Sequence, residues 1–127
     1  MLRLLHFSDL HIGVENYGRP DPQTGLNTRL ADFLAAFDEL VDCAIASGVH
    51  LVLFAGDAYK GRDPSQTHQR EFARRVLRLA QAGIPVFLCV GNHDMPHAPS
   101  RASAVEIFGV LGVPGVTVGD DLRTYRV

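Results

Sequence analysis

The chain alternates short apolar runs with longer segments of helical periodicity, and this alternation restricts the fold more than any other feature. The apolar runs, each of strand length, occupy residues 2–7, 49–55, 84–90 and 115–119. Because the first three runs are apolar at nearly every position, they are typical of strands in a parallel sheet that is covered on both faces. The order β-α-β-α-β-α-β predicts an α/β fold with a mostly parallel sheet and right-handed crossovers.

Three segments between these runs are predicted to be helical. The first carries apolar residues at helical spacing from Leu30 to Ile45, and we expect Thr28 to cap it and Gly48 to end it. The second is expected from about residue 65 to 83, and a third, shorter helix from about 100 to 111. The one long connection, residues 13–27, is rich in Gly, Pro, Asn and Asp, and loops of such length in compact domains are usually functional or mobile.

Length and composition exclude several classes of protein. A chain of 127 residues forms one domain at most, and its net charge of −2 gives no support for a bulk nucleic-acid binder. The apolar stretches fall short of a membrane span, and the N-terminus lacks the long apolar region of a signal peptide. Cys43 and Cys89 lie in apolar runs, so we expect buried free thiols in a reducing cytoplasm and no membrane association.

Polar residues follow each of the first three predicted strands at its C-terminal end. Residues 8–11 read Ser-Asp-Leu-His, residues 56–57 read Gly-Asp, and residues 91–94 read Gly-Asn-His-Asp. Ligand sites in open α/β sheets form outside the carboxyl ends of the strands. We therefore expect the three polar clusters to converge at one edge of the sheet.

The residue types in these clusters predict a metal site. Asp9 and His11 are two residues apart, so in an extended chain they point the same way and can hold one ion. Asp57 offers two carboxylate oxygens that can bridge two ions, and Asn92 offers a neutral oxygen; this ligand set suits Mn²⁺, Mg²⁺, Fe²⁺ or Zn²⁺. Two ions about 3.5–4 Å apart clamp a phosphate ester during cleavage. His93, next to a predicted ligand, can donate a proton to a leaving oxygen.

Each cluster alone has a plainer explanation. Asp-x-His is usually a surface coincidence, Gly-Asp a common turn, and Gly-Asn-His-Asp can be a polar turn as well. All three in this order, each behind a strand and separated by helices, favour a metal site.

The motifs "FSDLHIG", "LFAGDAYKGRDPS" and "GNHDMP" resemble those of the calcineurin-like metallophosphoesterases. Within that superfamily the chain is similar over nearly its whole length to the SbcD-type nucleases, the bacterial relatives of the Mre nucleases of DNA break repair. The resemblance implies metal-dependent phosphodiester hydrolysis of DNA, with an SbcC-type ATPase as partner. It also implies two divalent ions, with Mn²⁺ foremost.

The resemblance also implies a role for each matching residue. Asp9 and His11 would hold the first metal, Asp57 would bridge, and Asn92 would hold the second metal and touch the scissile phosphate. His93 would stabilise or protonate the leaving oxygen. We add the expectation that Asp94 orients His93.

The sequence departs from the family pattern in two ways. The resemblance implies a four-layer α/β/β/α sandwich of which residues 1–127 are the N-terminal part, ending before further ligand histidines, so the metal site is expected to be incomplete. The remaining histidines do not substitute: we expect His6 to be a core or edge residue and His68 and His97 to face solvent. In addition, Lys60 stands where this nuclease branch often carries His or an acidic residue.

Several alternatives stay open at this point. The chain can be another phosphoesterase of the superfamily that acts on nucleotides or phosphoproteins, or a metal-poor, inactive fragment. The second predicted helix carries four arginines that can contact DNA or a second subunit of a homodimer, although we favour a solvated helix face. These arginines are Arg70, Arg74, Arg75 and Arg78.

Overall fold

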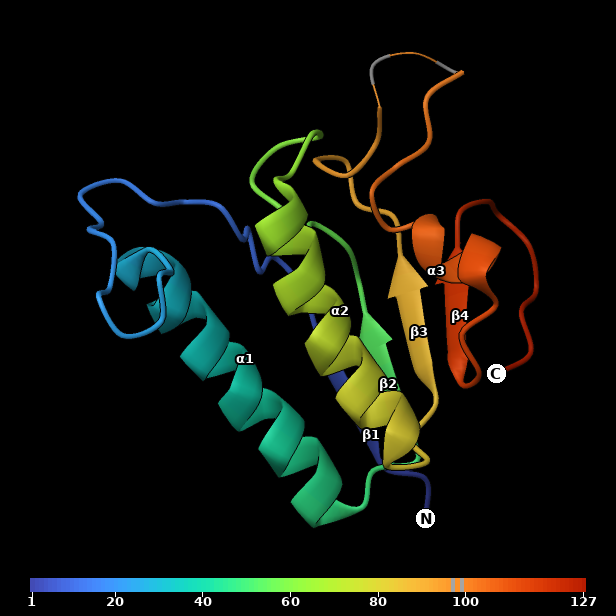
Figure 1. The fold of residues 1–127 in the computed structure, drawn as a ribbon. Coiled ribbons are helices and arrows are strands. Elements are labelled where there is room, and N and C mark those ends of the chain that lie inside the picture. The colour runs from blue at the N-terminus through green and yellow to red at the C-terminus, as the bar shows by residue number, and fades with distance from the viewer. Residues whose placement is uncertain (97, 99) are drawn as a thin grey trace.

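A four-stranded parallel sheet forms the centre of the computed structural model, which describes residues 1–96, 98 and 100–127 (Figure 1). The strands stand in the spatial order β1-β2-β3-β4, and each neighbouring pair is parallel. Their bounds are β1 Leu4–Phe7, β2 Leu51–Phe54, β3 Val86–Cys89 and β4 Val116–Gly119. The predicted α/β order is confirmed, although each strand is shorter than its apolar run.

Two long helices connect the first three strands. Helix α1 spans Thr28–Ser47 and ends at Gly48, which has the left-handed φ of 56° that favours glycine. The predicted cap at Thr28 is wrong: Thr28 is already helical, and the Asn27 side chain accepts the hydrogen bond from the Arg29 N–H at 2.8 Å. Helix α2 spans Gln66–Gln81.

The third helix is shorter than the predicted range 100–111. Helix α3 spans Ile107–Leu111 and is followed by the left-handed Gly112. Its start is delayed because the chain forms a turn first, in which the Ser103 N–H donates to the Glu106 carboxylate at 2.9 Å.

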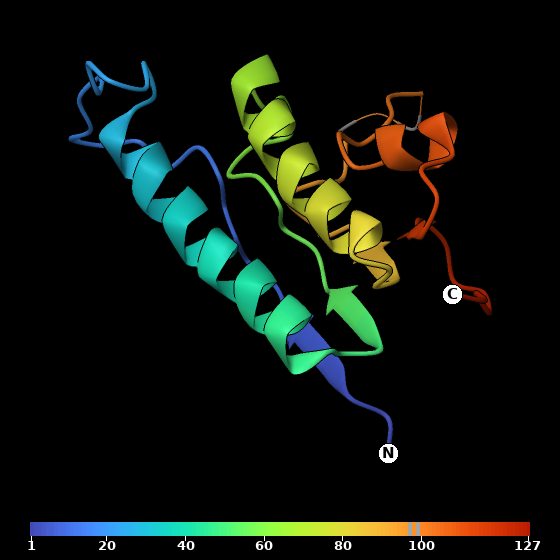
Figure 2. The ribbon, with the colours of Figure 1, turned by 60° about the horizontal axis from the view of Figure 1, so that its bottom comes forward.

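The core lies between the sheet and the helices, which cover one face of the sheet (Figures 1 and 2). Phe72 of α2 is fully buried at its centre, and four aromatic rings lie with their centroids within 5.9 Å of its own. They belong to Phe37, Phe54, Tyr59 and Phe108. Because Phe72 joins all three helices to the sheet, this side of the molecule is one continuous apolar layer.

The opposite face of the sheet is only partly covered by the described residues. Leu4 is 47% exposed there, and the Tyr125 ring packs against Phe87 with a centroid distance of 5.1 Å. The described residues therefore cover one face of the sheet with helices and leave the other face partly open. His6, which is exposed on the edge strand β1, is an edge histidine as predicted. A second sheet over this face stays a prediction.

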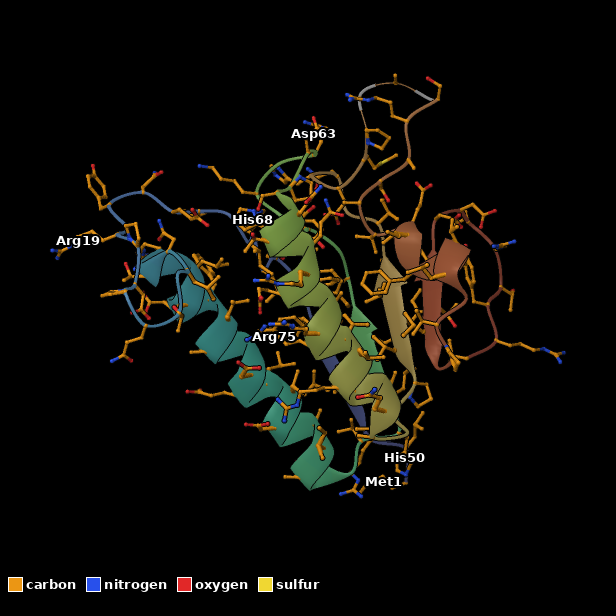
Figure 3. The ribbon with its side chains drawn as sticks, in the orientation of Figure 1. Met1, Arg19, His50, Asp63, His68 and Arg75 are labelled. Carbon is orange, nitrogen blue, oxygen red and sulfur yellow. The ribbon has the colours of Figure 1, made fainter. Side chains whose placement is uncertain are left out.

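The arginines of α2 hold the two long helices together. Arg75 lies between α1 and α2 (Figure 3), with its side chain 12% exposed and Nη2 2.7 Å from the Asp38 carboxylate. Its Nη1 lies 3.2 Å from Glu71, and Arg78 pairs with Asp42 at 2.6 Å. The predicted solvated helix face is thus wrong for Arg75, because α1 supplies acidic partners.

Both cysteines are free thiols, but only one of them is shielded. Cys89 is partly buried at the end of β3, whereas Cys43 is exposed on α1, contrary to the prediction. Cys43 is exposed because the buried stripe of α1 runs through Val41 and Ala44 instead. None of the helices in the described ranges is both long and apolar enough to cross a membrane.

Candidate metal centre

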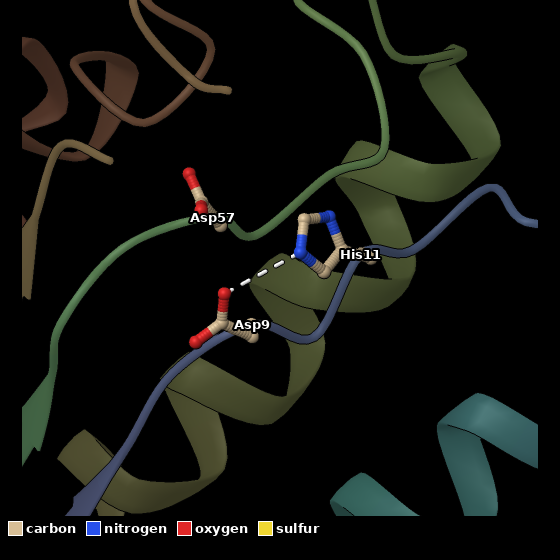
Figure 4. A group of neighbouring side chains, drawn as sticks. All are labelled: Asp9, His11 and Asp57. Carbon is tan, nitrogen blue, oxygen red and sulfur yellow. Dashed lines mark ion pairs between the residues drawn. The ribbon is translucent and has the colours of Figure 1, made fainter. Parts of the chain in front are cut away.

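The C-terminal ends of β1 and β2 bring Asp9, His11 and Asp57 together (Figure 4). One ligand atom of each side chain lies within 4.8 Å of those of the other two, and His11 Nε2 is 3.4 Å from an Asp9 oxygen. Two carboxylates and an imidazole at this separation fit a divalent cation, which would draw them closer. Asp9 is exposed and Asp57 is nearly buried, so the group opens to solvent on one side.

The backbone at this group is unusual. Asp9, His11 and Asp57 all have positive φ, at 59°, 45° and 61°, and they are three of the four such non-glycine residues in the described part of the chain. The expectation that Asp9 and His11 meet through an extended chain is therefore wrong, since both adopt the left-handed conformation. Such conformations persist where the surrounding structure enforces them, and they cluster at functional sites.

Backbone hydrogen bonds beyond the strands enforce this conformation. The N–H groups of Asp9, His11 and Ile12 donate to the carbonyls of Gly56, Asp57 and Ala58 at 3.0–3.1 Å. The first two polar loops therefore run side by side past the edge of the sheet.

Asp9 is held in its charged form. A hydrogen bond from the Ser8 hydroxyl lowers the pKa of the Asp9 carboxyl and outweighs the opposing effect of burial, and the neighbouring His11 also lowers it. An ionised carboxylate is the form that a divalent cation requires.

The loop after β3 packs against the same group. The His93 N–H donates to Asp57 Oδ1 at 2.9 Å, and the His93 ring stands edge-to-face to the His11 ring with centroids 5.1 Å apart. Asn92, one residue before His93, is exposed on this loop. The predicted convergence of all three polar loops is thus observed, whereas the roles of the five predicted site residues stay predictions.

Glycines permit this close approach of the loops. A Cβ at Gly91 would lie 2.3 Å from the Asp57 nitrogen, and one at Gly56, whose φ is 103°, would lie 2.5 Å from the Gly91 Cα. Only glycine fits at these two positions without moving the neighbouring backbone.

Asp94 does not take the predicted role beside His93. Its carboxylate is 2% exposed and accepts from the N–H groups of Asp57 at 2.8 Å, Gly91 at 3.0 Å and Ala58 at 3.1 Å. These bonds occupy the oxygens with backbone donors, which is why the expectation that Asp94 orients the imidazole is wrong. Burial raises the pKa of this carboxyl, and the N–H donors act in the opposite direction.

Two further contacts near the group were not predicted. The prediction that His68 faces solvent is wrong, because its side chain is only 16% exposed. Its Nε2 lies 2.7 Å from the Glu15 carboxylate, and this contact ties the long loop to α2. Arg62 Nε donates to the Met95 carbonyl at 2.6 Å. Both contacts join residues more than 30 positions apart, so a local sequence pattern does not predict them. The predicted solvent-facing His97 lies outside the described residues.

Lys60 lies just beyond Asp57 on the exposed side of the group. Its N–H donates to the Ile12 carbonyl at 3.0 Å, and with Gly13, Ser65 and His68 it lines a cavity of about 450 Å³. Lys60 therefore borders open space at the edge of the sheet.

The chain belongs to the calcineurin-like phosphoesterase family, whose model matches residues 2–126. It is also similar to archaeal proteins named DNA double-strand break repair protein Mre11. The identity is 35% to the protein of Thermoplasma acidophilum, 34% to that of Halobacterium salinarum and 30% to that of Archaeoglobus fulgidus. The matches cover 97%, 89% and 99% of this chain and 30%, 27% and 28% of the respective relative. The chain thus spans less than a third of the length of these relatives.

Proposed function

We propose that the protein hydrolyses phosphodiester bonds of DNA with two divalent ions, as a nuclease of the SbcD type in DNA repair or recombination. The observation that carries this proposal is the group Asp9, His11 and Asp57, which lies at the expected sheet edge in a chain of the phosphoesterase family. The names of its archaeal relatives support DNA as the substrate.

The residues of the group would divide the metal ligation between them. Asp9 and His11 would hold the first ion, Asp57 would bridge, and Asn92 would contribute to the second. Mn²⁺ is the ion we favour. When bound, the ions would supply an activated water and neutralise charge on the phosphate. The ionised state of Asp9 prepares the group for this role.

His93 would act on the leaving oxygen. Its backbone is fixed by the hydrogen bond to Asp57, and its side chain is exposed at the open side of the group. An imidazole in this place can give up a proton to the oxygen that departs from phosphorus. Because His11 lies against its ring, His93 is confined to the neighbourhood of the first metal position.

The partners follow from the same resemblance. We propose an SbcC-type ATPase as a partner subunit and a cytoplasmic location, where DNA is the substrate. Association into a homodimer is a further proposal, which light scattering at rising protein concentration can check.

Two substitutions in the full-length protein test the proposed roles. His93→Ala should lower the Mn²⁺-dependent cleavage of linear DNA by about 10²–10⁴-fold and keep the metals, because general acid catalysis typically contributes that much. Asp57→Ala should lose metal and activity together. His6→Ala, an exposed edge residue, serves as the control and should match the wild type.

Metal analysis and cleavage assays on these variants decide between the readings. Loss of metal in His93→Ala would show that His93 is a metal ligand. Full cleavage activity of His93→Ala would show that His93 has only a structural role in the turn. Cleavage of nucleotides or phosphoproteins in place of DNA would favour another phosphoesterase of the family.

A further inference from the structure

We infer that Asp94 is a positioning residue that binds the loop after β3 to the loop after β2 and so fixes Asn92 and His93 relative to Asp57. This inference rests on the proposed function for its catalytic consequence. Its structural content is a contact between two loops that can be measured without metal or substrate.

The two loops exchange hydrogen bonds between carboxylates and backbone. Asp94 accepts from the N–H groups of Asp57 and Ala58 on the other loop and from Gly91 on its own. In return, Asp57 accepts from the His93 N–H. Each loop therefore provides a carboxylate for the backbone of its neighbour, and neither loop can shift without breaking bonds at both ends.

Burial makes the Asp94 bonds hard to replace. The residue is 2% exposed, so the three N–H groups that it accepts have no ready access to water. An asparagine at this position would lose the negative charge that strengthens all three bonds, and its NH₂ group would replace the oxygen that accepts from Ala58 at 3.1 Å.

Arg62 acts on the carbonyl side of the same turn. Its Nε donates to the Met95 carbonyl at 2.6 Å, and its Nη2 lies 3.5 Å from the Asn92 carbonyl. Asp94 thus holds the turn through N–H groups and Arg62 holds it through carbonyls. Residues that orient metal ligands in this manner commonly change metal affinity or activity by about 10–100-fold when they are replaced.

Amide hydrogen exchange of the metal-free chain tests the contact itself. Asp94→Asn should speed exchange at the amides of Asp57, Ala58 and Gly91 and leave the amide of Leu88 in β3 protected. Asp63→Asn, which changes a carboxylate that is 81% exposed, is the matched control and should leave all of these amides unchanged. Unchanged exchange at the three amides of Asp94→Asn would overturn the inference.

Mn²⁺ titration and kinetics of the full-length protein test the consequence. We expect Asp94→Asn to bind Mn²⁺ about 10–100-fold more weakly and to lose kcat with little change in KM for DNA. Excess Mn²⁺ should restore part of the kcat that Asp94→Asn loses, but none of the kcat that His93→Ala loses. A substitution that only destabilised the fold would not respond to Mn²⁺ in this way. Wild-type Mn²⁺ affinity and kcat in Asp94→Asn would overturn the inference.

Two outcomes keep this test separate from that of the proposed function. If the wild type cleaves no DNA, the nuclease proposal fails, and amide exchange with Mn²⁺ affinity still decides the role of Asp94. If Asp94→Asn does not fold, Arg62→Ala replaces it, because Arg62 is exposed. It should bind Mn²⁺ about tenfold more weakly, and wild-type affinity would contradict the inference. Arg101→Ala, also exposed, is its control.

Discussion

The helix-covered face of the sheet and its C-terminal edge are built from the same three strands but differ in every physical respect. On the covered face the backbone is regular, and the side chains of Val52, Phe54 and Leu88 are buried and apolar. A few residues further on, the edge carries left-handed backbone at Asp9 and Asp57. The apolar face stabilises the fold, whereas the edge gathers polar side chains on a backbone of unfavourable conformation.

The cost at the edge has two identifiable sources. Left-handed conformations of residues other than glycine cost on the order of 1–3 kcal/mol each when they are enforced. In addition, ligand atoms of Asp9 and Asp57 lie within 4.8 Å of each other, so two carboxylates face one another until a cation lies between them. The backbone cost disappears when a residue of the edge is replaced by glycine, and the predictions below use this difference between the face and the edge.

The largest effect is expected in the covered face. Phe72→Ala should lower the free energy of unfolding by about 3–5 kcal/mol, because it removes a fully buried ring that contacts all three helices and leaves a cavity. Urea denaturation measures this, and Leu77→Ala on the same helix, where the side chain is 43% exposed, should cost far less. Equal losses of unfolding free energy in Phe72→Ala and Leu77→Ala would show that Phe72 is not at the centre of the core.

A smaller loss is expected where the two long helices meet. Glu71→Gln should cost about 2 kcal/mol at neutral pH, because the Glu71 side chain is 6% exposed and accepts charge-assisted hydrogen bonds from Arg70 and Arg75. Arg74→Ala, which removes only a surface partner of the same carboxylate, should cost less than about 1 kcal/mol.

The pH dependence of this loss has a definite sign. Burial of Glu71 acts to raise its pKa, but the hydrogen bonds from Arg70 and Arg75 hold the pKa below its ordinary value of 4.5. Between the two values the unfolded chain binds more protons than the folded chain, so stability falls as the pH falls through this window. The advantage of the wild type over Glu71→Gln should therefore be full above about pH 5 and shrink below pH 4.5. A difference that stays constant with pH would contradict the ion pair.

The smallest effect has the opposite sign and separates the edge from the rest of the chain. In metal-free buffer, Asp9→Gly should raise the free energy of unfolding by about 1 kcal/mol, because glycine adopts the left-handed backbone at this position without steric cost. The same exchange at Asp32, an exposed residue inside α1, should instead cost about 0.3 kcal/mol, because glycine is a slightly poorer helix former than aspartate. A loss of stability in Asp9→Gly would show that the edge is not strained.

Sequence patterns predicted those features of the structure that arise within a single strand, helix or loop. The apolar runs predicted the order of strands and helices along the chain. The polar residues behind each strand predicted that Asp9, His11 and Asp57 converge. The backbone conformation of Asp9 and His11 was not predictable, because it is imposed by hydrogen bonds that their N–H groups donate to carbonyls of residues 56–58, far along the chain.

The role of Asp94 shows the same limit. Its partners on the other loop stand 36 and 37 positions away, and its burial depends on how closely two glycine-containing loops pack. A local reading assigned it to its neighbour His93, whereas the folded chain uses it to join two loops.

Paramagnetic broadening by Mn²⁺ tests the central claim, that this edge of the sheet is the metal site, most directly. With Mn²⁺ added at well below one equivalent to the labelled chain, the amide signals of Asp9, His11 and Asp57 should broaden first, because broadening falls steeply with distance from the ion. The signals around Asp38 and Asp42 on α1, where carboxylates are already paired with arginines, should stay sharp. Broadening that begins on α1, or that spreads evenly over the chain, would contradict the account.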